Sequence, residues 1–325
     1  MMKASDLTPL NLDEEKARFF ADQTYNPQFK YRKPIDSEFE TFLTRYGFPD
    51  EEIGQFLEQK LADERYVSSP EDEDFLSREE VVGQVDNLSE RLGLEKIEVV
   101  FDENQLTGAK VSYRPSQISF KAQPIRRAFL PKTLNHEIQT HYLRSYNQRH
   151  LCQKTLSFPT RLFTEEGLAV INGNFALRRL SLTKIMLHYL GVYYASKYGF
   201  AQTFAKLRQY YQSDLFTWKA TLRYKRGLED TSQPGGFTKD KAYLEGVVLV
   251  ANWLGDPNND PRLLYGGKYD LINPVDNNCD IDGLKYPTFY DDLEAYRQFV
   301  RELVEVNNLN FLYSELEPYF ASLKQ

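Results

Sequence analysis

The chain has 325 residues, which is enough to bury a sizeable core in one large domain or in a large domain with a smaller one appended. Hydrophobic residues make up 41% of the sequence and aromatic residues 14%, so its composition is that of a globular protein and not of a disordered one. The formal net charge of −7 argues against nucleic acid as a partner, because no overall positive charge is present to hold a phosphate backbone.

The first ninety residues predict polar helices with no evident chemistry. Their start lacks the basic region and the apolar run of a secretory signal. Apolar residues recur at helical spacing over 39–46 and 53–61, and residues 68–74 predict a solvated loop. Ser77, with Glu80 three residues later, has the pattern of a capping box, so we expect a further helix to begin there.

Short segments rich in β-branched and aromatic residues follow from Ile97. They cover residues 97–101, 109–113 and 117–121, and Gly108 separates the first two. A small antiparallel sheet is the simplest arrangement of such segments.

Helices dominate the remainder of the chain. Pro131 suits the first turn of a helix, and Leu134, Ile138 and Tyr142 repeat every four residues after it. Thr164 is the expected N-cap of the next helix. Further helices are expected over 180–198, 200–211, 237–254 and 290–306.

Two features bear on the compartment. Cys152 and Cys279 are the only cysteines, too few for a disulfide framework in a chain of this size, and we expect both to be ordinary thiols. The apolar stretch at 247–254 is far too short to cross a bilayer. We therefore expect a cytoplasmic protein with no membrane partner, and nothing in the sequence indicates an oligomeric state.

The segment HEIQTH places two imidazoles and a carboxylate within two helical turns. His136 and His141 are two of only four histidines in the chain, and Glu137 follows the first directly. Two histidines and one carboxylate are the ligands of a catalytic zinc site that keeps its fourth position open. A structural site would not need the adjacent glutamate, whose role in hydrolysis is to take a proton from water at the metal.

The spacing of these histidines requires a distorted helix. In a regular helix, positions five apart point about 140° away from each other around the axis, whereas positions four apart differ by about 40°. A π-type bulge inserts one residue without ending the helix, and such bulges are frequent at functional sites. We therefore predict a π distortion between His136 and His141.

A third ligand is needed, and Glu166 is the candidate. It lies twenty-five residues after His141, in the expected first turn of the next helix, from where it can reach a metal on the neighbouring helix. A glutamate in a first turn is ordinarily there to interact with the helix dipole, so Glu166 alone would carry little weight.

Three segments together carry a resemblance to a known family. They are NHEIQTHYLRSYN at 135–147, TEEGLAV at 164–170 and GGFTKDKAYLEG at 235–246. In this order they resemble the tyrosine carboxypeptidase family, zinc enzymes that include the eukaryotic proteases that remove the C-terminal tyrosine of α-tubulin. Bacterial relatives have been named for a QEGLA motif. The likeness extends over about residues 92–272.

The resemblance implies that zinc (Zn²⁺) is held by His136, His141 and Glu166, that Glu137 is catalytic, and that the substrate ends in Tyr or Phe. This chain departs from the bacterial motif at Glu165, where those relatives have Gln; the ligand is kept and its neighbour is changed. Residues 1–90 show no evident basic surface for acidic tubulin tails, so microtubules are not implied.

A carboxypeptidase must also hold the terminal carboxylate of its substrate, which Arg or Lys does through charge-assisted hydrogen bonds. Lys239 is the first candidate because it lies inside the third shared segment, and Arg226 and Arg223 follow. Tyr243, four residues after Lys239, lies on the same helical face and can donate to a developing oxyanion. Each of these residues has an alternative as an exposed charge or a core tyrosine.

We therefore predict an α+β, mostly helical, zincin-like metallopeptidase fold with a small antiparallel sheet. Residues 1–90 form its N-terminal helical extension and residues 91–325 its metallopeptidase domain. The predicted activity is that of a zinc metallocarboxypeptidase acting on aromatic C-termini of peptides or proteins. An aminopeptidase or endopeptidase with the same zinc site, and a non-catalytic interaction protein with structural zinc, are the alternatives. Non-haem iron oxygenases use similar ligands but do not require the glutamate beside the first histidine.

Overall fold

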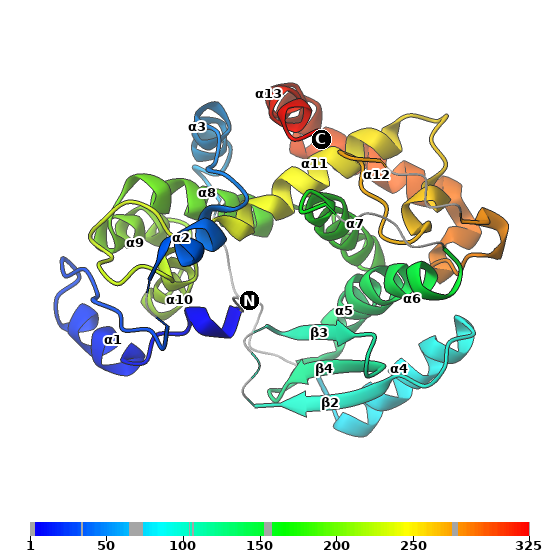
Figure 1. Cartoon of the computed structure of the whole chain (residues 1–325), viewed down its shortest axis with the longest axis horizontal. Coiled ribbons are helices and arrows are strands. Elements are labelled where there is room, and N and C mark those ends of the chain that lie inside the picture. The colour runs from blue at the N-terminus through cyan, green and yellow to red at the C-terminus, as the bar shows by residue number, and fades with distance from the viewer. Residues whose placement is uncertain are drawn as a thin grey trace. The chain divides into compact units, whose positions relative to one another are not determined.

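The computed structural model describes residues 4–33, 35–64, 74–103, 105, 107–152, 158–274 and 279–324. Helices dominate and the strands are short, which confirms the predicted α+β class (Figure 1). Contacts divide the chain into unit 1, Met1–Pro70 with Leu182–Leu244, and unit 2, Glu71–Ser181 with Glu245–Gln325. The domain boundary expected after residue 90 stays a prediction.

Unit 1 is helical. Acidic N-caps begin two of its N-terminal helices, since Asp36 accepts the backbone N–H of Phe39 and Asp50 accepts that of Ile53. These helices confirm the periodicity over 39–46 and 53–61. The elements are η1 (Ala4–Leu7), α1 (Leu12–Ala21), α2 (Ser37–Thr44), α3 (Glu51–Lys60), α8 (Thr183–Lys197), α9 (Phe200–Arg208), α10 (Asp214–Lys225) and η4 (Thr238–Asp240).

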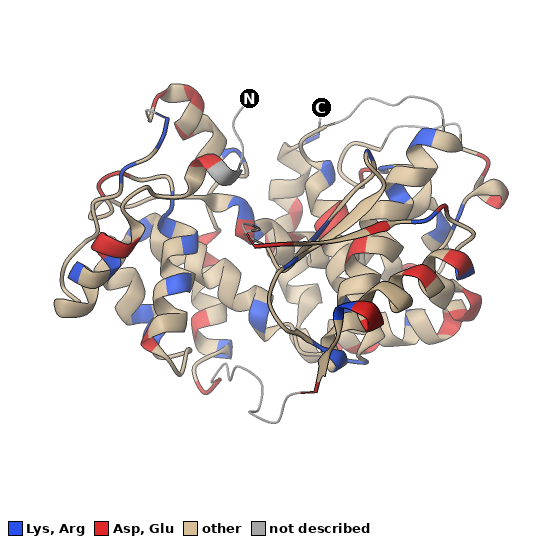
Figure 2. Ribbon diagram, turned by 90° about the horizontal axis from the view of Figure 1, so that it is seen from below, with Lys and Arg blue, Asp and Glu red and all other residues tan. Residues whose placement is uncertain are grey.

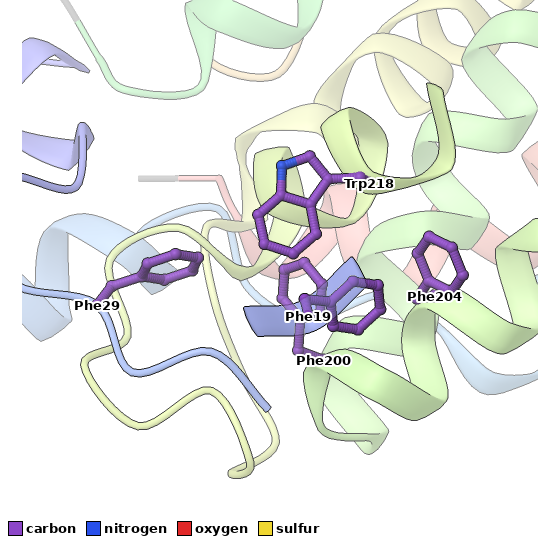
Figure 3. Packing of buried hydrophobic residues seen from close by; sticks show 5 residues of the cluster. All are labelled: Phe19, Phe29, Phe200, Phe204 and Trp218. Carbon is purple, nitrogen blue, oxygen red and sulfur yellow. The ribbon is translucent and has the colours of Figure 1, made fainter. Parts of the chain in front are cut away.

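An aromatic cluster forms part of the core of unit 1 (Figure 3). The ring of Phe19 in α1 lies 5.1 Å from that of Phe200, 4.8 Å from that of Phe204 and 5.0 Å from that of Trp218, measured between centroids. Phe29 packs against Phe200 from the loop after α1. The N-terminal segment therefore shares a core with residues more than 170 positions later in the chain.

The three strands predicted in unit 2 are present, but their arrangement differs from the expected one. The order is β2 (Glu98–Asp102), β4 (Gln117–Lys121), β3 (Ala109–Ser112); β4 pairs antiparallel with β3 and parallel with β2. The sheet is thus mixed and not wholly antiparallel. β4, the strand with the most buried side chains, takes the centre, so β2 pairs with β4 and not with β3, which follows it in the chain. A second, antiparallel pair joins β1 (Phe75–Leu76) to β5 (Ile125–Arg126).

Helices make up most of the rest of unit 2 (Figure 1). The capping box of Ser77 and Glu80 is confirmed at the start of α4 (Arg78–Arg91). Sequence reasoning missed the last helix, although its buried residues Leu309, Leu312 and Leu316 have helical spacing. The other elements are η2 (Arg127–Phe129), α5 (Leu130–His136), η3 (Glu137–Tyr142), α6 (Leu143–His150), α7 (Arg161–Ala176), α11 (Lys241–Gly255, which begins in unit 1), η5 (Pro261–Tyr265), η6 (Ile281–Gly283), η7 (Thr288–Asp292), α12 (Leu293–Asn307) and α13 (Leu309–Ser322).

The start of α7 corrects one prediction. The helix begins at Arg161 with Thr160 before it, so Thr164 lies inside the helix and is not its N-cap. Thr164 is used elsewhere, because its hydroxyl oxygen accepts the backbone N–H of Leu271 at 3.0 Å. The hydroxyl of Thr164 therefore binds a segment distant in the sequence and does not cap a helix.

The two cysteines correct another prediction. Cys152, just after α6, and Cys279, just before η6, form a disulfide across a sequence separation of 127 residues. The expectation of two free thiols is wrong, because only the folded chain brings the two segments together. Disulfides are rare in reducing compartments, so this bond counts against the cytoplasmic location, which stays a prediction.

Charged residues of both signs are interspersed along the elements of each unit (Figure 2). The pair of Arg18 and Glu14, 2.6 Å apart and more than half exposed, is typical. Such exposed pairs contribute about 0–1 kcal/mol each, so the buried cores carry most of the stability. In the part of the chain that the structure describes, no helix combines the length and the apolar character needed to cross a membrane.

Candidate metal centre

The segment HEIQTH lies on a distorted helix. Glu137–Tyr142 forms a π-helix between α5 and α6, and the backbone N–H of Leu143 donates to the carbonyl of Ile138, five residues earlier. This confirms the predicted π distortion. The extra residue returns His141 to the face of His136, and their Nε2 atoms lie 3.3 Å apart.

Glu166 of α7 completes a three-residue cluster. Its Oε2 atom lies 3.8 Å from Nε2 of His136 and 3.7 Å from Nε2 of His141. Within the described residues this is the group of His, Cys, Asp or Glu side chains whose ligand atoms converge closely enough to hold a metal ion. Bonds of about 2.0–2.2 Å in a tetrahedral site place donor atoms roughly 3.3–3.6 Å apart. The donor types therefore fit a single zinc ion, and their separations of 3.3, 3.7 and 3.8 Å lie at or slightly above this range.

A close helix crossing brings Glu166 to this position. α7 packs along α5 and the π-helix (Figure 1), and on its other side it meets the unit 2 part of α11. At that crossing, a Cβ atom on Gly167 would lie 2.1 Å from the carbonyl carbon and oxygen of Gly246. Only glycine fits there. The glycines of two of the segments that carry the family resemblance, EGLA and YLEG, are therefore in direct contact.

Glu165 contacts the other ring nitrogen of His141. Its Oε1 atom lies 3.4 Å from Nδ1 of His141 and accepts a 2.6 Å hydrogen bond from Nζ of Lys268. Burial opposes the charge on Glu165, but the hydrogen bond to His141 and the positive charges of Lys268 and Arg144 hold its pKa well below the usual range. Burial alone would lower the pKa of His141, yet Glu165, Glu166 and Glu137 together raise it.

This carboxylate fixes the orientation of an imidazole, as residues behind metal-ligating histidines commonly do. Sequence reasoning noted Glu165 as a departure from a motif but did not predict its contact with His141, and it missed Lys268 altogether. No local signal pointed to Lys268, because it lies 103 residues from its partner.

Glu137 is the first residue of the π-helix and follows His136 directly. Its side chain is half-buried, and its charge acts on His141. The carboxylate of Glu137 therefore lies next to the three-residue cluster without being one of its members.

The three residues predicted to bind substrate, and Tyr243 with its predicted catalytic role, belong to unit 1. Arg223 donates two hydrogen bonds to the carboxylate of Asp240, at 2.5 and 2.7 Å, so its Nε and Nη2 atoms are engaged. Arg226 stacks on Phe237, 4.7 Å from the ring centroid. Its buried Nε has no hydrogen-bond partner among the described residues.

Lys239 lies in η4, and its Nζ is 6.0 Å from the ring centroid of Tyr243 in α11. The catalytic role of Tyr243 and the carboxylate-binding roles of Lys239, Arg226 and Arg223 stay predictions. The remaining two histidines contact tyrosine hydroxyls: His150 contacts the hydroxyl of Tyr113, and His188 that of Tyr224.

Fold and cluster together define the class: an α+β protein with a helix-borne group of two histidines and one carboxylate, of the kind that holds a single metal ion. A family model described as microtubule-associated tyrosine carboxypeptidase matches residues 40–292, so the chain belongs to this family. The match begins well before the start expected from the three segments.

Curated relatives extend the match over most of the chain. The proteins named microtubule-associated tyrosine carboxypeptidase 1 of Mus musculus and Homo sapiens are each 29% identical to it. The corresponding protein of Rattus norvegicus is equally similar. Each alignment covers 94% of this chain and 68% of the relative.

Proposed function

We propose that this protein is a zinc metallocarboxypeptidase that removes a C-terminal aromatic residue from peptides or proteins. The observation that carries the proposal is the convergence of His136, His141 and Glu166 beside Glu137, on a helix whose π turn makes that convergence possible. Membership of a family named for tyrosine carboxypeptidases supports the reaction class.

The residues divide into three roles. His136, His141 and Glu166 hold zinc, which when bound supplies a Lewis acid and a readily deprotonated water. Glu137 takes the proton from the attacking water and passes it to the leaving amine. Glu165 holds the imidazole of His141 in the tautomer that presents Nε2 to the metal.

The proposed substrate is a free C-terminus, and the names of the relatives support tyrosine as its last residue. Among the candidate cations Lys239 stays first, because it lies inside the third of the segments that carry the family resemblance. Charge-assisted hydrogen bonds to a carboxylate are worth roughly 1.5–3 kcal/mol. Lys239→Ala is therefore expected to cost about ten- to a hundredfold in kcat/KM on a free-acid peptide and little on the amidated one.

The test combines metal analysis with paired peptides. Purified protein is assayed for zinc and for release of tyrosine from a peptide ending in Tyr, with its amidated form and a form ending in Ala beside it. Glu137→Gln is expected to retain zinc and to lose about 100- to 10,000-fold in kcat. His136→Ala, His141→Ala and Glu166→Ala are expected to lose zinc, because a three-ligand site has no spare ligand.

Each alternative gives a different result. Equal cleavage of the free-acid and the amidated peptide would indicate an endopeptidase and not a carboxypeptidase. Release of the N-terminal residue would indicate an aminopeptidase. If the protein binds zinc but hydrolyses no peptide in a library varied at both ends, the remaining alternative is a non-catalytic interaction protein with structural zinc. Wild-type turnover by Glu137→Gln would remove the general base from the proposal.

A further inference from the structure

We propose that a buried hydroxyl–amide network holds the π turn in place and so keeps the two histidines in register for the metal. The network, here called the π-turn clamp, consists of Thr140, Asn172, Tyr265 and Tyr296, all in unit 2. The inference rests on metal binding, which is part of the proposed function. It assigns a positioning role to residues that do not touch the metal cluster.

A π turn needs support because it interrupts regular backbone pairing. One inserted residue shifts hydrogen bonds from the fourth to the fifth preceding residue, and isolated π turns are correspondingly rare. Two side-chain hydroxyls donate to backbone carbonyls, one just before this turn and one within it. Thr140 Oγ1 donates to the carbonyl of Asn135 at 2.8 Å, and the hydroxyl of Tyr265 donates to that of Gln139 at 2.7 Å.

Asn172 joins these two hydroxyls. Its Nδ2 donates to Oγ1 of Thr140 at 2.8 Å and to the hydroxyl oxygen of Tyr265 at 3.0 Å, and its Oδ1 accepts the hydroxyl of Tyr296 at 2.7 Å. Both amide protons and the amide oxygen are therefore used. The side chains of Thr140, Asn172, Tyr265 and Tyr296 are fully buried, so a missing partner would leave a desolvated polar group at a cost of about 1–3 kcal/mol.

The clamp also connects the two helices that carry the ligands. Asn172 lies six residues after Glu166 on α7, and its backbone carbonyl accepts a 3.1 Å hydrogen bond from the side-chain amide of Asn135. Asn135 directly precedes His136. One set of hydrogen bonds thus ties the helix of the carboxylate ligand to the turn that presents the histidines, and relaxation of that turn to a regular helix would point the histidines about 140° apart.

Tyr265→Phe is the primary test, with Tyr290→Phe as its matched control. Tyr290 is buried in the same aromatic cluster, 5.4 Å from Tyr265 between ring centroids, but its hydroxyl bonds to the carbonyl of Pro261 and not to the π turn. Zinc affinity is measured by competition with a chelator. The absorption spectrum of the cobalt-substituted protein reports the coordination geometry, and thermal unfolding without metal reports the fold.

Tyr265→Phe is expected to lower zinc affinity by about ten- to a hundredfold, the range found for residues that orient metal ligands, and to change the cobalt spectrum. Tyr290→Phe is expected to leave both unchanged. If both variants lose thermal stability but bind zinc as tightly as the wild type with the same cobalt spectrum, the clamp is only part of the core and the proposal fails.

A second pair keeps the proposal testable if Tyr265→Phe does not fold. Thr140→Val removes the hydroxyl at nearly constant shape, and Thr140→Ser keeps it. The clamp requires reduced zinc affinity in the first variant and near wild-type affinity in the second. Equal affinity in the two would overturn it, whereas a wild-type protein that binds no zinc at all would overturn the proposed function instead.

Discussion

Substituting Gly167 by Ala tests whether the helix crossing positions the carboxylate ligand. The new Cβ atom would lie 2.1 Å from the carbonyl carbon and oxygen of Gly246. Because carbon contacts are optimal at roughly 3.5–4.0 Å, α7 and α11 must separate by more than about 1 Å. Glu166 directly precedes Gly167, so the same movement displaces its carboxylate relative to His136 and His141.

Two opposing effects decide the magnitude. Ala in place of Gly in a helix interior stabilises by about 1 kcal/mol, whereas overpacking a tight contact costs typically about 1–3 kcal/mol. The cost is at the upper end here, since the opposing atoms belong to backbone and cannot rotate away. We expect Gly167→Ala to lower the free energy of unfolding by about 1–2 kcal/mol. A displacement of about 1 Å can also cost a hundredfold in catalysis.

Urea unfolding of the metal-free protein and chelator competition for zinc measure the two effects separately. Gly83→Ala is the control, because Gly83 lies in α4 and a Cβ atom added there would meet no neighbouring atom within 4 Å, so this variant should show only the helical gain. We expect zinc affinity to fall at least about tenfold in Gly167→Ala and not in Gly83→Ala. Wild-type stability and affinity in Gly167→Ala would show that the crossing does not position Glu166.

Three further predictions concern other parts of the chain. Lys268→Met should weaken zinc binding by about ten- to a hundredfold, because Glu165 then lacks the partner that holds it against His141; undiminished affinity in chelator competition would refute this. Changing both Cys152 and Cys279 to Ser should lower the free energy of unfolding by about 4–5 kcal/mol in the loop-entropy estimate, and mass spectrometry showing two free thiols in the non-reduced wild type would contradict the bond itself. Burial lowers the pKa of His188 to about 3. As pH drops, the imidazole is therefore protonated in the unfolded state before it is protonated in the folded state. The free energy of unfolding should fall by at most about 1.4 kcal/mol per pH unit between about pH 6.5 and pH 3. His188→Gln should flatten that part of the acid-unfolding curve, and an unchanged slope would argue against it.

Local features of this protein were accessible from the sequence alone. The capping box of Ser77, the three strand segments and the helix through HEIQTH follow from interactions between residues a few positions apart. The π distortion was predictable as well, because two histidines five residues apart can share one face of a helix only if a residue is inserted.

Other features depend on segments that meet only in the folded chain. The contact of Lys268 with Glu165 joins residues 103 positions apart, the hydrogen bond between Asn172 and Tyr265 joins residues 93 apart, and the disulfide of Cys152 spans 127. The central place of β4 depends likewise on which strands pair in the folded sheet. A sequence pattern records the preference of a residue for a helix, a strand or the interior, but which distant partner completes its hydrogen bonds is decided when the helices and strands pack, and in this protein that packing orients the ligands.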